Sequence, residues 1–505
     1  MPTGSPSFEQ DARKIATALE RRRYLVLALL TVLYALGAVR HAASKPLWYD
    51  EIITVISASA PDAAGTWRAA QASDASPPLL HLLTHFSIQW FGSSDVAIRL
   101  PAIVGFWIFC LCLFHCVRRR AGIYFGIAAL VMPIATEAYT YSYDARAYGP
   151  ELAFCGLMLV AWQTAAEGRR RLAAPVLLAL SLAGAMLLQY YAVLLYLPLG
   201  GAELFRTWRT RRWNWGIWAA FACGIAPLVW RIAAVRHIVS QFSQTTWAPA
   251  YPEQVVEYWE TMLQHSLSFV VVGLAVLALR LIGDRMEEPA APPKLAGHEL
   301  LAGVLFLAIP VMAVAIGLFK THMFTPRYAL IGVTGVLLLV PMIAARLANG
   351  RAFAGFLLML VSMLPLVFVM LEVPARDNPV ARESTLVKAL EQGPVVVPDG
   401  QLFLQMWYYT PPPLKSKLVF LIDYEAAVQY MGFDAIDVGI GNLRPWAAVP
   451  AVEYKDFATP GREFRLYQNS MRPGWVLGKV VGDGGSTQIE QYATYRQLVR
   501  VRLKP

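Results

Sequence analysis

Long uninterrupted apolar runs restrict this chain to one class of architecture. Residues 24–39 and 352–371 contain no charged side chain, and a stretch of about 18 or more residues with few charges is typical of a transmembrane helix. The 505 residues are 57% hydrophobic and 15% charged, whereas an ordinary soluble chain carries about 25% charged residues. The sequence therefore predicts a polytopic α-helical membrane protein, and it excludes a disordered chain, a collagen and a disulfide-stapled secreted domain.

The net charge of +10 is concentrated in the hydrophobic part of the chain. From residue 372 to the end, 15 lysines and arginines stand against 14 acids, so nearly all of the excess lies earlier. There the basic residues form short clusters beside apolar runs, at residues 21–23, 118–120, 169–171 and 206–212. Such clusters mark the cytoplasmic ends of membrane spans, whereas a nucleic-acid-binding protein would carry a basic soluble face with interleaved aromatics. We therefore expect a lipid bilayer, and no nucleic acid, among the partners of this chain.

The alternation of apolar runs with basic clusters predicts about 11 transmembrane helices. The polar start of the chain carries no cleavable signal, so the first span is expected to be retained. This places the N-terminus in the cytoplasm, a first external loop at about 41–96, and the C-terminus outside. The spans are expected at about 22–40, 97–117, 122–138, 151–166, 173–190, 191–205, 215–234, 263–282, 299–318, 328–345 and 352–371.

The hydropathy pattern of the sequence changes after Glu372, where long apolar runs give way to short ones. Short β-leaning runs at 395–397, 418–422 and 500–503 are separated by turn-forming residues such as Pro398-Asp399-Gly400. Residues 385–392 and 424–431 read as short helices. We therefore expect two domains, a transmembrane domain at 1–371 and a small extracytoplasmic α/β domain at 372–505.

Two adjacent acids stand about ten residues beyond the first span, in Trp48-Tyr49-Asp50-Glu51. Aspartate is ionised near pH 7, and a less polar site can raise its pKa, so Asp50 is a candidate general base. The alternative is a solvated loop that Trp48 and Tyr49 anchor at the membrane interface.

A run of tyrosines surrounds one arginine at another external boundary, at residues 139–148. A guanidinium group forms bidentate, charge-assisted bonds to phosphate, so Arg146 suits a lipid-linked phosphate, and tyrosines such as Tyr143 and Tyr148 can line a sugar pocket. The alternative is an aromatic belt in which Arg146 pairs with Asp144. A further external group could bind the same phosphate or simply contact lipid headgroups; its members are Lys320, His322, Arg327 and Tyr328.

Metal ligation is only weakly suggested. Cys112, His115 and Cys116 could share a helix face, but buried cysteine usually behaves as a small hydrophobic residue. His81 and His85 follow a Pro77-Pro78 pair that suits the first turn of an interfacial helix, and two histidines alone are a weak signal. We expect no cofactor; a divalent metal is possible but not indicated.

Several short motifs together resemble a known family. They are residues 47–52, the Pro77-Pro78 pair, Ala97-Ile98-Arg99-Leu100-Pro101, Ala145-Arg146-Ala147-Tyr148 and Pro326-Arg327-Tyr328. In their order and spacing they are similar to the GT-C membrane glycosyltransferases, in the branch of protein O-mannosyltransferases and lipid A aminoarabinose transferases. The similarity covers roughly residues 20–345.

The resemblance implies inverting transfer of a monosaccharide from a polyprenyl-phosphate donor at the extracytoplasmic face. The acceptor would be a lipid, a surface glycan or a protein. The first-loop acid of the family falls on Asp50, as base, and its neighbouring acid falls on Glu51, in a supporting role. The donor phosphate and sugar would be held by Arg146, Tyr143, Tyr148, Arg327, Lys320 and Tyr190.

Two positions depart from the family. Relatives often carry a lysine near the proline pair, and residues 73–76 offer none, so phosphate binding would rest on Arg146 and other cations. Relatives tend to have His-Tyr at the tip after the fifth span, where this chain has Gln189-Tyr190-Tyr191.

Two other functions compete with this one. A transporter or flippase of lipid-linked sugars would need ionisable groups near mid-membrane, whereas the predicted spans are nearly free of acids. A non-catalytic assembly or export subunit would leave Asp50 and Arg146 without a task. Arginine-rich inner loops favour a multi-pass protein of a bacterial inner membrane, with the C-terminal domain in the periplasm.

Overall fold

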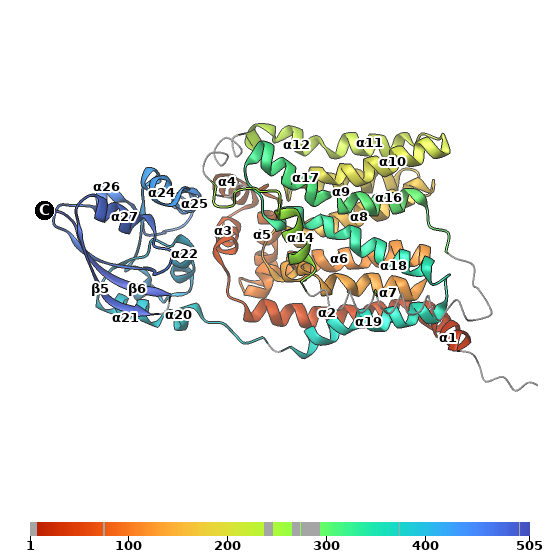
Figure 1. The fold of residues 1–505 in the computed structure, drawn as a ribbon, viewed down its shortest axis with the longest axis horizontal. Helices are drawn as coiled ribbons and strands as arrows, with labels where there is room; N and C mark the ends of the chain where they lie inside the picture. The colour runs from red at the N-terminus through yellow and green to blue at the C-terminus, as the bar shows by residue number, and fades with distance from the viewer. Residues whose placement is uncertain are drawn as a thin grey trace, which may run out of the picture.

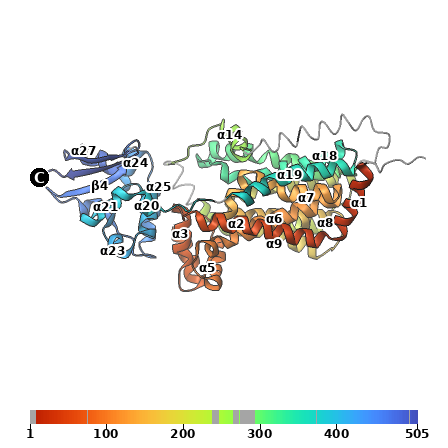
Figure 2. The same cartoon turned by 90° about the horizontal axis from the view of Figure 1, so that it is seen from below.

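The computed structural model describes residues 8–73, 76–236, 246–264, 273, 293–372, 374–493 and 495–505. Figures 1 and 2 show a long helical bundle with a smaller domain at one of its ends, joined by an extended segment that follows α19. The smaller domain contains a six-stranded sheet. The predicted fold class, an α-helical membrane protein with a small C-terminal α/β domain, is therefore confirmed.

The bundle combines long helices with short irregular ones. Its α-helices are α1 (Phe8–Arg21), α2 (Arg23–Ser44), α3 (Tyr49–Ala58), α4 (Ala63–Ser73), α5 (Leu79–Phe91), α6 (Asp95–Ala121), α7 (Ile123–Val131), α8 (Tyr148–Ala166), α9 (Ala173–Met186), α10 (Tyr196–Thr210), α11 (Trp215–Gly224), α12 (Ala226–Trp230), α14 (Gln254–Met262), α16 (Gly297–Leu307), α17 (Ile309–Ile316), α18 (Thr334–Leu347) and α19 (Ala352–Leu371). Five segments have tighter or looser winding: η1 (Met132–Ala135), η2 (Glu137–Tyr143), η3 (Tyr190–Leu195), η4 (Gly317–Thr321) and η5 (Pro326–Val333).

Within the described residues, five helices are long and apolar enough to cross a membrane, or six if one bent pair counts as a single span. The bent pair joins residues 123–135 to η2 at an angle of 75°. The predicted span at 263–282 lies almost wholly outside the described residues. The number of eleven spans therefore stays a prediction.

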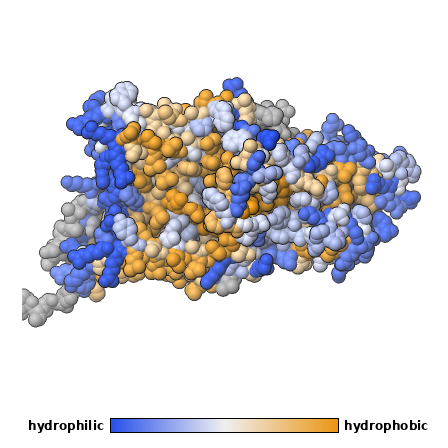
Figure 3. Space-filling model, turned by 180° about the vertical axis from the view of Figure 1, so that it is seen from behind, coloured by the Kyte–Doolittle hydropathy of each residue, from blue (hydrophilic) through white to orange (hydrophobic). Residues whose placement is uncertain are grey.

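The charged residues near the two ends of helix α6 give an estimate of the apolar thickness of the bundle. Arg99 near its start and Arg118 near its end are 19 residues apart, which corresponds to about 28 Å at 1.5 Å per residue. This length is close to the roughly 30 Å of a bilayer core. Figure 3 shows a band of apolar side chains around the bundle on the face drawn, with hydrophilic residues at both ends. The bundle thus has the dimensions and the surface of a membrane domain.

The basic clusters gather at the end of the bundle where α6 finishes. Arg118 pairs with Glu20 at 2.5 Å, and Arg120 pairs with Glu299 at 2.5 Å and with Glu167 at 2.7 Å. These pairs tie together α1, α6, α16 and the end of α8. The C-terminal domain lies at the opposite end of the bundle (Figure 1).

The predicted first external loop is itself helical. Helices α3, α4 and α5 occupy most of it, and α5 begins at Leu79, directly after the Pro77-Pro78 pair, as the sequence predicts. Beyond it, α8 packs on α6 through glycines: a Cβ added at Gly149 would lie 2.4 Å from the carbonyl oxygen of Ala102. This close approach fixes the first turn of α8, and hence residues 144–147, against the start of α6.

The sheet of the C-terminal domain has the strand order β3-β2-β1-β4-β6-β5. Strands β1 to β4 are parallel, and β6 and β5 add an antiparallel hairpin at one edge. Its strands are β1 (Val395–Val396), β2 (Leu418–Ile422), β3 (Ala451–Glu453), β4 (Glu463–Asn469), β5 (Ser486–Ala493) and β6 (Arg496–Arg502). Its helices are α20 (Pro379–Arg382), α21 (Ser384–Gln392), α22 (Gly400–Tyr409), α23 (Pro412–Lys415), α24 (Tyr424–Met431), α25 (Ala435–Leu443), α26 (Tyr454–Phe457) and α27 (Trp475–Gly482).

The sequence predicts part of this domain. The strand at 418–422 and the helices at 385–392 and 424–431 are present as β2, α21 and α24. The last predicted strand, at 500–503, is the end of a longer β6, and β3, β4 and β5 have no counterpart among the predictions. Because β5 is almost entirely exposed, it lacks the kind of apolar run that predicts β1, β2 and the end of β6.

A buried acid in this domain makes its stability depend on pH. Burial raises the pKa of Asp437 from 3.8 to about 7, although Trp475 Nε1 donates a hydrogen bond to its carboxylate at 2.9 Å. Between about pH 4 and 7 the folded state therefore holds a proton that the unfolded state has released, and the free energy of unfolding falls as the pH rises. The slope is at most about 1.4 kcal/mol per pH unit.

The substitution Asp437→Asn should remove this slope. We expect the variant to melt at a higher temperature than the wild-type protein at pH 8 and at a similar temperature at pH 4.5. Thermal unfolding of the purified protein across this range measures the difference, with exposed Asp456→Asn as the control. An equal difference at both pH values would contradict the assignment.

Candidate active site

Asp50 and Glu51 lie in the first turn of α3, where the helix dipole favours negative charge. The Glu51 carboxylate accepts a hydrogen bond from the backbone N–H of Trp48 at 3.2 Å and so closes the N-terminus of the helix. Consecutive residues of a helix point roughly 100° apart, so the two acids have different surroundings. The side chain of Asp50 is 19% exposed, whereas that of Glu51 is completely buried.

The buried Glu51 forms an ion pair with the equally buried Arg99 of α6. Arg99 donates to both carboxylate oxygens, from Nε at 2.8 Å and from Nη2 at 2.7 Å. Its remaining donors reach three carbonyl oxygens that lead into α3, those of Ala42, Lys45 and Pro46. All five N–H groups of the guanidinium therefore have an acceptor, and the pair fixes the chain on which Asp50 stands.

Glu51 also binds the segment that precedes α8 and contains Arg146. Its Oε1 accepts a hydrogen bond from the backbone N–H of Ala145 at 2.7 Å. The next residue, Arg146, is thereby placed beside the first turn of α3. Glu51 thus connects α3, α6 and the residues before α8, and it has no exposed surface for a substrate.

Asp50 lies between two arginines. Its Oδ2 is 3.8 Å from Nη2 of Arg146 and 3.5 Å from Nη1 of Arg327. The side chains of both arginines are more than four-fifths buried. These three residues, the Asp50 cluster, come from three distant parts of the chain and unite an anion with two cations in a partly enclosed site.

Aromatic rings surround the guanidinium of Arg327. Its centre lies 5.6 Å from the ring of Trp48, 5.7 Å from that of Trp247 and 6.0 Å from that of Tyr328. Cation–π contacts of this kind hold an arginine in place without using its N–H groups. Its Nε has no hydrogen-bond partner within the described residues, so Arg327 retains donor capacity for a ligand.

A second cluster of charges lies beside the first. Lys45 forms an ion pair with Asp144 and lies 5.7 Å from the ring of Tyr143, which stacks on His41. Burial, and then the charge of Glu51, raises the pKa of Asp144 to about 6, while Lys45 opposes the shift. Asp144 is therefore paired with Lys45 and not with Arg146, contrary to the alternative that the sequence left open. Tyr143 belongs to this second cluster.

The remaining predicted site residues lie around these clusters. Tyr148 is buried at the start of α8 with its ring 4.9 Å from that of Tyr141. Tyr190 begins η3, and its buried hydroxyl has no partner among the described residues. Lys320 is exposed in η4. In the part of the chain that the structure describes, no hydrogen bond or ion pair joins Tyr190 or Lys320 to Asp50.

Three contributors to the site, Arg99, Lys45 and Trp247, are not among the site residues that the sequence predicts, although Arg99 belongs to the 97–101 motif. Arg99 stands inside the second span, and Lys45 and Trp247 are isolated residues of their types near membrane boundaries. A basic residue within an apolar span requires a buried partner, and this rule could have directed attention to Arg99. No comparable rule selects Lys45 or Trp247.

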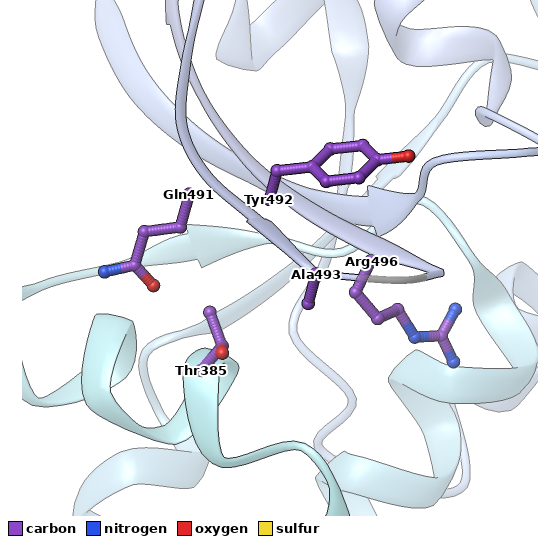
Figure 4. A pocket seen from close by; sticks show the side chains of 5 residues that line it. All are labelled: Thr385, Gln491, Tyr492, Ala493 and Arg496. Atoms are coloured by element: carbon purple, nitrogen blue, oxygen red, sulfur yellow. The ribbon is translucent and has the colours of Figure 1, made fainter.

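Among the described residues, no group of three or more His, Cys, Asp and Glu side chains is arranged to hold a metal ion. A hollow of about 290 Å³ lies in the C-terminal domain instead, lined by Thr385, Gln491, Tyr492, Ala493 and Arg496. Figure 4 shows that the ring of Tyr492 extends away from the other lining side chains. This hollow is formed by α21 and the β5–β6 hairpin and contains no residue of the Asp50 cluster.

Comparisons with known proteins connect this geometry to a family. The sequence model of the dolichyl-phosphate-mannose-protein mannosyltransferases matches residues 75–230. The fold is similar to that of ArnT from Cupriavidus metallidurans in the apo state, with a TM-score of 0.57 and 12% sequence identity over 95% of this chain and 98% of that chain. The same protein bound to undecaprenyl phosphate gives a TM-score of 0.54 with equal identity and coverage. No curated protein matches the sequence.

These similarities confirm the resemblance to GT-C membrane glycosyltransferases. The structural similarity extends beyond residues 20–345, over which the motifs suggest it, and includes the C-terminal domain. The chain therefore has the fold of a multi-pass GT-C membrane protein.

Proposed function

We propose that this chain is a GT-C glycosyltransferase that moves a monosaccharide from a polyprenyl-phosphate donor to an acceptor on the extracytoplasmic face of a bacterial inner membrane. The observation that carries the proposal is the Asp50 cluster, in which one carboxylate lies between two guanidinium groups. The family match at residues 75–230 supports sugar transfer, and the ligand of the similar ArnT structure, undecaprenyl phosphate, supports the donor class.

The two arginines suit the donor phosphate. Guanidinium groups bind phosphate oxygens through charge-assisted hydrogen bonds, and Arg146 and Arg327 approach one point from different elements. As the bond between the sugar and the phosphate breaks, negative charge grows on the departing phosphate. Fixed cations beside it stabilise that charge, which lowers the barrier.

Asp50 suits the role of general base. In the proposed step, the acceptor hydroxyl oxygen forms a bond to the anomeric carbon while the bond from that carbon to the phosphate oxygen breaks. The hydroxyl proton passes to the Asp50 carboxylate, and the polyprenyl phosphate leaves with the bonding electrons. A single displacement of this kind inverts the anomeric configuration and needs no covalent sugar–enzyme intermediate.

Binding of the donor would also release Asp50 from its interaction with the two arginines. Without donor, the Asp50 carboxylate lies 3.8 Å from the guanidinium of Arg146 and 3.5 Å from that of Arg327. An incoming phosphate offers them a stronger anionic partner, and Asp50 then becomes available to the acceptor. Glu51 does not face the substrate but connects α3 to residues 144–147 through its hydrogen bond from the N–H of Ala145. We therefore assign it a positioning role.

The charges at the two ends of the bundle support one orientation in the membrane. The arginine clusters lie at the end where α6 finishes, so we place that end and the N-terminus in the cytoplasm. The Asp50 cluster and the C-terminal domain then face the periplasm. A donor at this end keeps its polyprenyl tail in the bilayer while its phosphate reaches the arginines.

Release of polyprenyl phosphate tests the proposal. The purified protein in lipid is supplied with a panel of polyprenyl-phosphate hexoses and pentoses, with a membrane extract as the source of acceptor. We expect release from one donor and transfer of its labelled sugar into the extract. Transport of the intact lipid-linked sugar across the bilayer, with no release from any donor, would overturn the proposal in favour of a flippase.

Loss of either arginine should weaken donor binding. We expect Arg327→Gln and Arg146→Gln to raise the dissociation constant for undecaprenyl phosphate about 10- to 100-fold, because each removes a charge-assisted hydrogen bond. Binding to the protein in nanodiscs measures the effect. The matched control is Arg171→Gln, an exposed arginine in a cytoplasmic cluster. Equal affinity of all three variants and the wild-type protein would exclude the two arginines from the phosphate site.

A further inference from the structure

The segment that leads into α3 has partners in the C-terminal domain. Leu47 is completely buried three residues before Asp50. Its backbone N–H donates to the phenol oxygen of Tyr409 at 2.6 Å, and its carbonyl oxygen accepts from Nε2 of Gln405 at 2.9 Å. Buried backbone groups need partners, and at Leu47 both partners are side chains from the C-terminal domain.

One helix face supplies both contacts. Gln405 and Tyr409 are four residues apart in α22, so they lie on the same side of that helix. The amide of Gln405 is itself oriented by Arg382, which donates to its oxygen at 3.1 Å. Helix α22 therefore presents a donor and an acceptor that together satisfy both backbone groups of one residue.

Apolar packing extends this contact along α3. Tyr49, Ile52 and Ile56 of α3 belong to the same buried cluster as Phe403 and Ile440 of the C-terminal domain. The hydroxyl of Tyr49 donates to the carbonyl oxygen of Ile436 in α25 at 3.3 Å. The domain thus packs on the helix that carries Asp50, and Figure 2 shows α3 at the end of the bundle that faces it.

The opposite side of the same segment is held by Arg99. That arginine binds the carbonyl oxygens of Ala42, Lys45 and Pro46 from within the membrane bundle. The chain before Asp50 therefore has hydrogen-bond partners in both domains, Arg99 of α6 in the bundle and Gln405 and Tyr409 of α22 in the C-terminal domain. Asp50 lies three residues after Leu47, where the backbone contacts from α6 end and those from α22 begin.

We infer that the C-terminal domain sets the position of the catalytic base, with Gln405 and Tyr409 as positioning residues that act on Asp50 through the backbone of Leu47. This inference rests on the proposed function. A displacement of about 1 Å in a reacting group can cost roughly 100-fold in rate, so a domain that contacts no reacting atom can still determine kcat.

The substitution Tyr409→Phe tests the inference because it removes only the oxygen that accepts from Leu47. We expect kcat for polyprenyl phosphate release to fall about tenfold, with donor KM within twofold of the wild-type value. The matched control is Tyr408→Phe, since the neighbouring ring packs at 5.1 Å on Tyr409 and its hydroxyl makes no hydrogen bond within the described residues. Gln405→Met is the second variant, should Tyr409→Phe fail to fold.

A double substitution separates positioning from simple loss of structure. If Tyr409 acts through Asp50, then Tyr409→Phe should cause no further loss of rate in the Asp50→Asn background. Hydrogen exchange of peptides covering residues 46–52 should be faster in Tyr409→Phe than in Tyr408→Phe. If Tyr409→Phe lowered kcat by the same factor in the wild-type and Asp50→Asn backgrounds, the inference would be overturned and the proposed function would stand. Unchanged kcat in both Tyr409→Phe and Gln405→Met, in an enzyme that is otherwise active, would have the same consequence. A wild-type protein that releases polyprenyl phosphate from no donor would overturn the proposed function and the inference with it.

Discussion

Asp50→Asn is expected to lower kcat for sugar transfer about 1000-fold. A positioned general base contributes about 100- to 10,000-fold to rate, and asparagine keeps the shape of the side chain without accepting a proton. The variant should still bind undecaprenyl phosphate at least as tightly as the wild-type protein, because the Asp50 carboxylate no longer competes with the phosphate for Arg146 and Arg327. Single-turnover release and equilibrium binding, measured on the same preparation, check both parts.

A matched control isolates the effect of the carboxylate. Asp456→Asn makes the same change at an exposed acid of the C-terminal domain, and we expect it to leave both measurements unchanged. Full transfer activity in Asp50→Asn would remove Asp50 from the role of base. Loss of donor binding together with activity would instead assign Asp50 to the structure of the phosphate site.

Arg99→Met should have the largest effect on stability. Both members of the Glu51–Arg99 pair are completely buried, and removing one partner of a buried pair leaves an uncompensated charge that costs about 3 to 5 kcal/mol. Three carbonyl oxygens that lead into α3 also lose their donors. We expect the variant to unfold at a much lower denaturant concentration than the wild-type protein, and to lose transfer activity because the Asp50 cluster loses its support.

Removal of the second charge tests this explanation. The double variant Glu51→Leu with Arg99→Met no longer buries an unpaired carboxylate, and we expect it to regain part of the lost free energy of unfolding. Denaturant unfolding in detergent compares the two variants with the wild-type protein. A double variant less stable than Arg99→Met would show that the carboxylate does not cause the loss.

The sequence predicts the elements that have strong local signals. Hydropathy locates α2 and α19, because such runs without charges have few other structures available. Proline chemistry locates the start of α5, and turn residues with short apolar runs locate β2 and α24. The motifs around Asp50, Arg146 and Arg327 predict residues that the fold brings together.

The sequence does not predict where the spans become irregular. The residues of η3 and η5 fall largely within spans predicted as straight helices, at 191–205 and 328–345, and η2 and η4 lie at or beyond the predicted span ends at 138 and 318, where no tighter or looser winding is predicted. Non-helical backbone at membrane depth is tolerated where the protein itself encloses it or where it lines a cavity. Tyr191 of η3 stacks on Tyr328 of η5 and bonds Thr321 of η4, so three of these segments meet beside Arg327. Such long-range pairing leaves no periodic signal.

The separate roles of Asp50 and Glu51 also depend on tertiary structure. Both acids stand in one short motif, and nothing local indicates that Glu51 is enclosed by Arg99 and Ala145 while Asp50 faces two arginines. The contact between Leu47 and α22 joins residues more than 350 positions apart. Only the packing of the C-terminal domain on the bundle reveals it.

The position of a bound donor phosphate tests the central claim most directly. A structure of the protein in lipid with undecaprenyl phosphate, determined by electron cryomicroscopy, would locate the phosphorus atom. We predict phosphate oxygens within hydrogen-bonding distance of both Arg146 and Arg327, with Asp50 farther from each guanidinium than the present 3.8 and 3.5 Å. A phosphate bound at Arg118 and Arg120, at the opposite end of the bundle, would contradict the account.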